Sequence, residues 1–241
     1  MTQHLNEFGQ PVGECVPGWT PRAKPEPLTL TGKWCRLEPL DAARHADDLF
    51  AAWRSGPDQR GWTYLGVGPF ERVEDFRAYA AAAAQSTDPR HYAVIDLGSG
   101  RAVGSLSLMR QDPANGVIEV GHVVFSPLLK QTRLSTEAQY LLMAYVFDTL
   151  GYRRYEWKCD SLNGPSRTTA GRLGFTFEGI FRQAIVYKGR NRDTAWFSIL
   201  DSEWPLNQRA FGAWLADSNF DDEGRQRISL ADLRAREKAA A

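Results

Sequence analysis

The feature that most constrains the fold of this chain is the order in which its hydrophobic pattern changes period. Between residues 28 and 200, stretches that alternate apolar and polar residues, typical of strands, are interrupted by stretches with the 3.6-residue period of helices. The pattern predicts one strand, two helices, three strands, one helix, one strand, one helix and two strands. Their ranges are 28–40, 41–55, 71–85, 91–97, 101–109, 116–125, 133–152, 153–160, 163–174, 175–189 and 193–201. Such an order indicates a mixed α/β domain.

The three consecutive strands are separated by the turn clusters GSG and QDPANG, which suit hairpin connections and predict an antiparallel meander.

We assign residues 28–203 to one domain. Residues 1–27 contain five prolines and little periodicity, and we expect an irregular arm that wraps the domain. Residues 204–241 have two helical stretches, and we expect a helical extension packed on the domain or extending from it.

Composition excludes several classes of protein. Lys plus Arg equals Asp plus Glu at 29 each, so the chain lacks the positive field used in non-specific nucleic-acid or membrane-surface binding. Three widely spaced cysteines, Cys15, Cys35 and Cys159, fit neither a disulfide framework nor a metal knuckle, and no HExxH spacing occurs. We therefore expect no metal and a reducing, cytoplasmic location. No export signal and no run of eighteen apolar residues is found.

The strand over 116–125 leads through a short loop into a long helix, for which Thr132 is a suitable N-cap. A helix N-terminus offers unpaired N–H groups and partial positive charge, which together bind phosphate. Lys130 and Arg133 lie beside it and would add charge-assisted contacts. The alternative is that Thr132 only caps a core helix and the two basic residues are solvated.

A second junction of the same kind follows the strand over 153–160. Asn163 is a good N-cap, Pro165 suits the first helical turn, and Ser166 stands three residues after the cap. Local capping alone would explain these residues. The functional alternative is that Asn163 and Ser166 also face a cofactor that lies between the two strands.

Taken together, the two junctions resemble the GNAT N-acetyltransferases, in particular their RimJ/RimL-type branch. The resemblance extends over residues 28–200 and rests on IEVGHVVFSP, on TEAQYLLMAYVFDTLGYRRYEWKCDS, and most specifically on RLGFTFEGIFRQ after N-x-x-S-R. It implies a splayed, mixed but mostly antiparallel sheet with helices on both faces. It also implies acetyl-CoA or another acyl-CoA as co-substrate, with the pantetheine arm in a split between the strands at 116–125 and 152–159.

The resemblance also implies which residues bind the coenzyme. The pantetheine would contact backbone groups of Val123, Val124 and Phe125. The pyrophosphate would be wrapped by Lys130, Gln131, Thr132, Arg133, Leu134, Ser135 and Thr136. The thiol end and the adenosine arm would lie near Asn163, Ser166 and Arg167. The family's pyrophosphate loop usually contains glycines, and this segment has none. We expect binding to be retained, with Arg133 contributing through its side chain.

Acyl transfer to an amine requires a deprotonated amine, a polarised thioester carbonyl and a stabilised leaving thiolate. Ser166 matches the position of the acid in some relatives. The glutamate that such relatives place on a later strand corresponds here to Ile185. We therefore prefer Glu119 as the base, with His122 second, although strand alternation predicts opposite faces for the two. Either residue could instead be an ordinary strand residue, in which case no side-chain base exists. For Cys159, a buried structural thiol is favoured over a nucleophile.

The resemblance thus implies an acyl-CoA-dependent N-acyltransferase that passes an acetyl or other short acyl group directly to a primary amine, on a protein N-terminus or a small molecule. One alternative is a coenzyme-binding module with little or no turnover. Another is a nucleic-acid-associated protein, suggested by Arg153, Arg154, Arg190 and Arg192 but disfavoured by the balanced charge. We expect the loop at 55–75, with Trp62, Tyr64 and Phe70, to help select the acceptor. A homodimer is compatible with the sequence.

Overall fold

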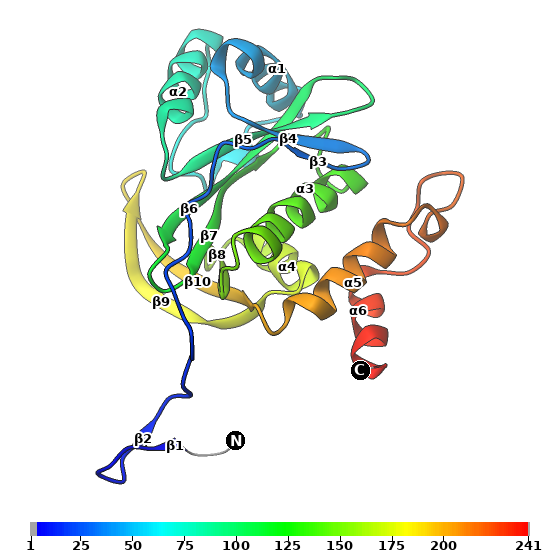
Figure 1. Cartoon of the computed structure of the whole chain (residues 1–241). Coiled ribbons are helices and arrows are strands. Elements are labelled where there is room, and N and C mark those ends of the chain that lie inside the picture. The colour runs from blue at the N-terminus through cyan, green and yellow to red at the C-terminus, as the bar shows by residue number, and fades with distance from the viewer. Residues whose placement is uncertain (1–3, 241) are drawn as a thin grey trace.

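The computed structural model describes residues 4–240, and its centre is an eight-stranded sheet (Figure 1). The strand order is β3-β4-β5-β6-β7-β8-β10-β9, with every neighbouring pair antiparallel except β7 and β8. The strands are β3 (Leu30–Thr31), β4 (Cys35–Pro39), β5 (Arg90–Asp96), β6 (Ala102–Asp112), β7 (Val117–Phe125), β8 (Arg154–Asp160), β9 (Thr176–Tyr187) and β10 (Arg190–Leu200). The expected mixed, mostly antiparallel sheet is confirmed.

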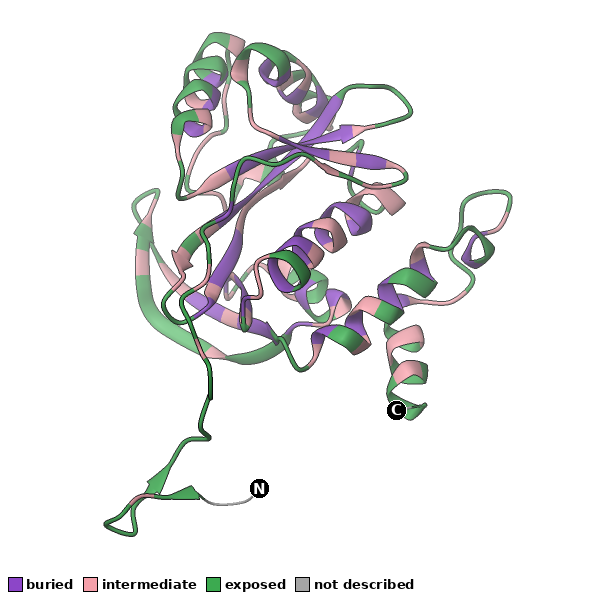
Figure 2. Cartoon of the chain, viewed as in Figure 1, coloured by how far each residue is buried: buried purple, intermediate pink, exposed green. Residues whose placement is uncertain are grey.

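Helices cover both faces of the sheet (Figures 1 and 2). They are α1 (Ala42–Arg54), the short 3-10 helix η1 (Arg60–Trp62), α2 (Val73–Gln85), α3 (Arg133–Ala144), which continues into the π-helical turn η2 (Tyr145–Thr149), α4 (Gly164–Leu173), α5 (Trp204–Leu215), the short η3 (Asp217–Asn219) and α6 (Leu230–Ala239). One apolar cluster joins α1 and α2 to the sheet through Leu49 and Phe76. A larger cluster joins α3, α4 and α5 to it, with Leu142, Leu173 and Phe211 fully buried.

The helices and strands predicted from periodicity are present within a few residues of their predicted bounds, with one exception. Residues 28–40 form a hairpin of β3 and β4 rather than a single strand. The chain reverses because the buried carboxylate of Glu137, on α3, accepts hydrogen bonds from the backbone N–H groups of Lys33 (2.7 Å), Trp34 (2.8 Å) and Cys35 (2.7 Å). Gly32 leaves room for that carboxylate, since a Cβ there would collide with it.

The sheet opens between its two parallel strands. β7 and β8 pair only over Val117–Val120 and Arg154–Trp157. Beyond these residues, β7 continues beside β6 and β8 continues beside β10. The split that the family resemblance implied therefore lies between the expected strands.

The N-terminal arm has two parts (Figure 1). The part next to the domain is bound to it: Trp19 Nε1 donates to the Ala114 carbonyl at 2.8 Å, and Arg22 Nε donates to the Gly151 carbonyl at 2.9 Å. The preceding part runs away from the domain and ends in the small hairpin of β1 (His4–Leu5) and β2 (Pro11–Val12). Residues 1–3 of the predicted arm lie outside the described residues.

The C-terminal extension is packed into the domain rather than placed beside it. Trp204 and Phe211 of α5 are buried in the same apolar cluster as α3 and stack against Tyr140. Within residues 4–240, no helix is long and apolar enough to cross a membrane.

Candidate active site

A cavity of about 510 Å³ occupies the place where β7 and β8 separate. Its walls come from β6, β7, β8, β9, β10, the start of α4 and the loop after η1. It brings together Glu119, His122, Val123, Asn163 and Ser166, which the sequence placed at two separate junctions. Ile185 lines the same cavity, so β9 contributes an apolar side chain where relatives are expected to have a glutamate.

A β-bulge in β7 turns two candidate bases toward the same cavity. The pairing of β7 with β6 shifts register between Ser105 and Ser107, and His122 has φ +46°. An extra residue in a strand reverses the alternation beyond it. The register shift therefore overturns the expectation that Glu119 and His122 lie on opposite faces, and both residues line the cavity.

Glu119 is a buried carboxylate held by two cations. Its side chain is 6% exposed, and Oε2 lies 2.9 Å from Lys158 Nζ and 3.3 Å from Arg110 Nε. Burial raises the pKa of Glu119, and the two cations act in the opposite direction. A carboxylate of raised pKa at the edge of a cavity is better suited to accept a proton than an exposed one.

Lys158 is a residue of this cavity that the sequence did not reveal. Its side chain is 6% exposed, and its ammonium lies 2.6 Å from Glu156 Oε2 and 3.8 Å from the centre of the Trp196 ring. Buried lysines are rare unless paired. No distinct signal in the sequence marks it, because Lys158 is one of four charged residues that alternate along β8, and such residues more often face solvent.

His122 is the second candidate base. Burial lowers its pKa, and its ring centre lies 5.0 Å from that of His91. The pKa of His91 falls to about 4 through burial and the nearby His122. Both imidazoles are therefore neutral at neutral pH, and a neutral imidazole can accept a proton.

Asn163 and Ser166 both take part in capping α4 and also line the cavity. Asn163 Oδ1 accepts from the Ser166 backbone N–H at 3.2 Å, as an N-cap should. The Ser166 hydroxyl accepts from Trp157 Nε1 at 3.0 Å, and its own proton can be donated to the nearby Cys159 sulfur or to a group in the cavity. Burial raises the pKa of the nearby Cys159 thiol. This residue is therefore a poor nucleophile, as expected of a structural thiol.

The segment at 130–136 begins α3 in the way the sequence suggested. Thr132 caps the helix by accepting from the Ser135 N–H at 3.3 Å. Gln131 has φ +62°, a left-handed conformation for which glycine is usually selected. A non-glycine residue thus adopts the backbone conformation that the missing glycines would favour. The Thr136 hydroxyl is buried and accepts from Arg172 at 3.1 Å.

Arg133, the first residue of α3, is held by the C-terminal extension. Its guanidinium carbon lies 3.5 Å from the ring centre of Phe220, and Nη1 lies 3.8 Å from Asp217 Oδ1. Asp217 also pairs with Lys33. Arg167 in turn donates to the Ser161 carbonyl at 3.2 Å. Each of the two arginines therefore already has partners within the chain.

The three residues of β7 that were expected to bind the pantetheine have different surroundings. Val123 lines the cavity, whereas the Val124 carbonyl accepts from Trp53 Nε1 at 3.4 Å. Phe125 packs against the main apolar cluster. Beyond Val120, the side of β7 that faces β8 has no strand partner in the described chain.

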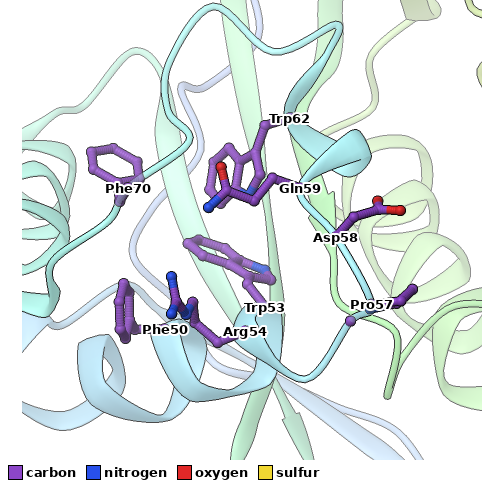
Figure 3. A pocket seen from close by; sticks show the side chains of 9 residues that line it. Phe50, Trp53, Arg54, Pro57, Asp58, Gln59, Trp62 and Phe70 are labelled. Atoms are coloured by element: carbon purple, nitrogen blue, oxygen red, sulfur yellow. The ribbon is translucent and has the colours of Figure 1, made fainter.

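The loop at 55–75 divides between two cavities. Tyr64 lines the main cavity and donates to the Leu162 carbonyl at 3.2 Å, so the loop bridges to the start of α4. Trp62 and Phe70 line a separate pocket of about 240 Å³ with Trp53 (Figure 3). Trp53 and Trp62 meet edge to face at 4.8 Å, and this aromatic cluster anchors the loop. Of the three aromatic residues, Tyr64 is the one at the main cavity.

The described residues hold no group of three or more His, Cys, Asp or Glu side chains that could bind a metal ion. The cavity instead combines the buried Glu119 carboxylate, the Ser166 hydroxyl and the side of β7 that has no strand partner in the described chain beyond Val120. This arrangement suits proton transfer near a bound acyl group.

Comparison with known proteins identifies the family of this chain. A sequence model described as an acetyltransferase (GNAT) domain matches residues 35–176. The chain therefore belongs to the GNAT acetyltransferases, and the resemblance drawn from the sequence is confirmed.

Two solved structures and one curated protein illustrate the family. A GCN5-related N-acetyltransferase from Brucella melitensis is 52% identical, with a TM-score of 0.90 over 91% of this chain and 100% of that one. A GNAT-family protein from Chromobacterium violaceum ATCC 12472 is 43% identical, with a TM-score of 0.75 over 81% and 98%. YdaF of Bacillus subtilis (strain 168), named as a candidate ribosomal N-acetyltransferase, is 29% identical over 105 residues, which is 44% of this chain. The match spans 57% of the length of YdaF.

Proposed function

We propose that this acetyltransferase transfers an acetyl or other short acyl group from acyl-CoA to a primary amine by direct attack. The observation that carries the proposal is that Glu119 and Ser166 line one cavity where β7 and β8 separate. The amine nitrogen attacks the thioester carbonyl, a C–N bond forms, and the C–S bond breaks. Glu119 takes the proton from the amine, and Ser166 donates a proton to the leaving sulfur; Glu119 then releases its proton to water, and water returns a proton to Ser166.

The remaining residues would hold the coenzyme. Backbone groups of Val123, Val124 and Phe125 would bind the pantetheine, and Lys130–Thr136 would surround the pyrophosphate. Asn163, Ser166 and Arg167 would lie at the thiol end and the adenosine arm. The capped start of α3 and the left-handed backbone of Gln131 support the assignment of the pyrophosphate, because a helix N-terminus presents backbone N–H groups that bind phosphate.

Arg133 provides the test of coenzyme binding. We expect acetyl-CoA to bind the wild-type protein in calorimetry, and Arg133→Ala to weaken that binding by about 1–3 kcal/mol because a charge-assisted contact to phosphate is lost. The rate at saturating coenzyme should change much less.

Arg133 also stacks on Phe220, so a second variant is needed to separate loss of this packing from loss of the contact to phosphate. Phe220→Leu removes the stacking and keeps the guanidinium, so it should bind acetyl-CoA nearly as well as wild type. Equal affinity in wild type and Arg133→Ala would leave Arg133 with a packing role only. No binding of acetyl-CoA to wild type at millimolar concentration would contradict the proposed function.

A further inference from the structure

Arg192 is the one arginine or lysine lining the main cavity for which residues 4–240 provide no ion pair. Lys158 and Arg110, the other two, are both paired with Glu119. Arg192 is partly buried on β10, and its Nε is shielded from solvent without a hydrogen-bond partner. Asp160, which lines the same cavity, instead accepts from the Tyr187 hydroxyl at 2.8 Å and from the Leu162 N–H at 2.9 Å.

Two further polar groups without partners follow Arg192 along the strand. Thr194 and Trp196 lie two and four residues further on; because the pairing of β10 with β9 shifts register between Arg192 and Thr194, the shared orientation of the three rests on the cavity lining rather than on strand alternation. All three line the cavity. Thr194 Oγ1 and Trp196 Nε1 are also buried without hydrogen-bond partners.

Buried polar groups in folded proteins nearly always have a partner, so each exception requires an explanation. Here three groups able to donate a hydrogen bond line the cavity from one strand, and one of them carries a positive charge. A guanidinium presents its N–H groups in a fork that matches the two oxygens of a carboxylate. The set is therefore suited to a ligand with a carboxylate.

We propose that the acceptor amine also carries a carboxylate, which Arg192, Thr194 and Trp196 bind while the amine is directed toward Glu119. Phe181, Ala184 and Ile185 line the same cavity and provide apolar surface for a side chain. The acceptor class is thus a small amino carboxylic acid, such as a free amino acid with an apolar side chain. This inference rests on the proposed function, which it deepens by naming the acceptor.

The test compares three acceptors that share the phenylethyl skeleton and differ in the group at the carboxylate position, namely phenylalanine, phenylalaninamide and phenethylamine. Each kcat/KM is expressed per deprotonated amine, because the three amines differ in pKa. Wild-type enzyme should show a kcat/KM for phenylalanine about 100-fold above that for the other two, because a site built for a polar group rejects analogues that lack it. Arg192→Gln should lower kcat/KM for phenylalanine about 100-fold, mainly through KM, and leave phenethylamine within about 3-fold. Arg192→Lys, which keeps the charge but not the fork, should be intermediate.

Arg190→Gln is the matched control, since Arg190 is exposed and lies two residues before Arg192 on the same strand. It should leave all three acceptors unchanged. Equal use of the three acceptors by wild type would overturn the proposal, and so would a preference for the amide, which would indicate a peptide N-terminus. An equal loss for all acceptors in Arg192→Gln would also overturn it.

A binding measurement separates this proposal from the proposed acyl transfer. N-acetylphenylalanine retains the carboxylate, and calorimetry should show that it binds wild type in the presence of CoA but binds Arg192→Gln at least 10-fold more weakly. If no amine is acylated and this difference persists, the transfer is refuted and the carboxylate site stands. If amines are acylated and the variant binds N-acetylphenylalanine like wild type, the carboxylate site is refuted.

Discussion

Glu119→Gln is expected to lower the rate of acyl transfer by roughly 10²–10⁴-fold, because it removes the group that takes the proton from the attacking amine. Coenzyme binding and the fold should be retained, because glutamine fills the same space and the buried Lys158 keeps its ion pair with Glu156 at 2.6 Å. Steady-state kinetics of coenzyme release, with calorimetric binding of acetyl-CoA as the control for folding, measure the effect.

The pH profile gives an independent readout of the same variant. An acceptor amine is mostly protonated at neutral pH, so kcat/KM should rise with pH in wild type and variant alike. Burial raises the pKa of Glu119, so in wild type the decline toward low pH should steepen as Glu119 becomes protonated. The variant should lack this steepening.

His122→Asn is the matched comparison, because His122 lines the same cavity and is already neutral at neutral pH. It should change the rate little if Glu119 is the base. A large loss in His122→Asn with a small one in Glu119→Gln would transfer the role to His122. Near-wild-type rates in both variants would mean that catalysis proceeds by orientation and carbonyl polarisation alone.

Glu137→Gln is expected to lower the free energy of unfolding by about 2–4 kcal/mol, as measured by urea denaturation. The Glu137 carboxylate accepts three backbone hydrogen bonds from the β3–β4 turn, two of them at Oε2 and one at Oε1. A glutamine keeps one acceptor oxygen and presents an NH₂ group to backbone N–H groups, which leaves buried donors without partners.

Glu223→Gln serves as the control, because the Glu223 side chain is 70% exposed and pairs only with an exposed arginine. It should change stability by less than about 0.5 kcal/mol. A Glu137→Gln protein as stable as wild type would show that the turn does not depend on this carboxylate.

Most of the fold could be predicted because periodicity and turn residues are local. The alternation over 116–125 and the apolar stripe of the helix after Thr132 are set by neighbouring residues alone. The β3–β4 hairpin could not be predicted, because it depends on Glu137, about a hundred residues later in the chain. Nothing near Gly32 indicates a carboxylate that will bind the turn.

The cavity was predictable only in part, for a similar reason. Ser166 and Glu119 could be proposed from strand-to-helix junctions and from the family resemblance. The shared orientation of Glu119 and His122 depends on a bulge, and a bulge reverses alternation without a distinct sequence signal. Lys158 and Arg192 resemble ordinary surface cations in the sequence, and only the packing of β8 and β10 places them at the cavity.

The central claim is that the cavity between β7 and β8 supports transfer of an acyl group from coenzyme A to an amine. The most direct measurement incubates wild-type protein with acetyl-CoA and a panel of primary amines, follows release of the coenzyme thiol, and identifies the product by mass spectrometry. We expect thiol release that requires an amine, with one acetyl group on the acceptor nitrogen and a rate that Glu119→Gln lowers. Binding of acetyl-CoA without amine-dependent thiol release for any acceptor would contradict the claim and indicate a coenzyme-binding module without turnover.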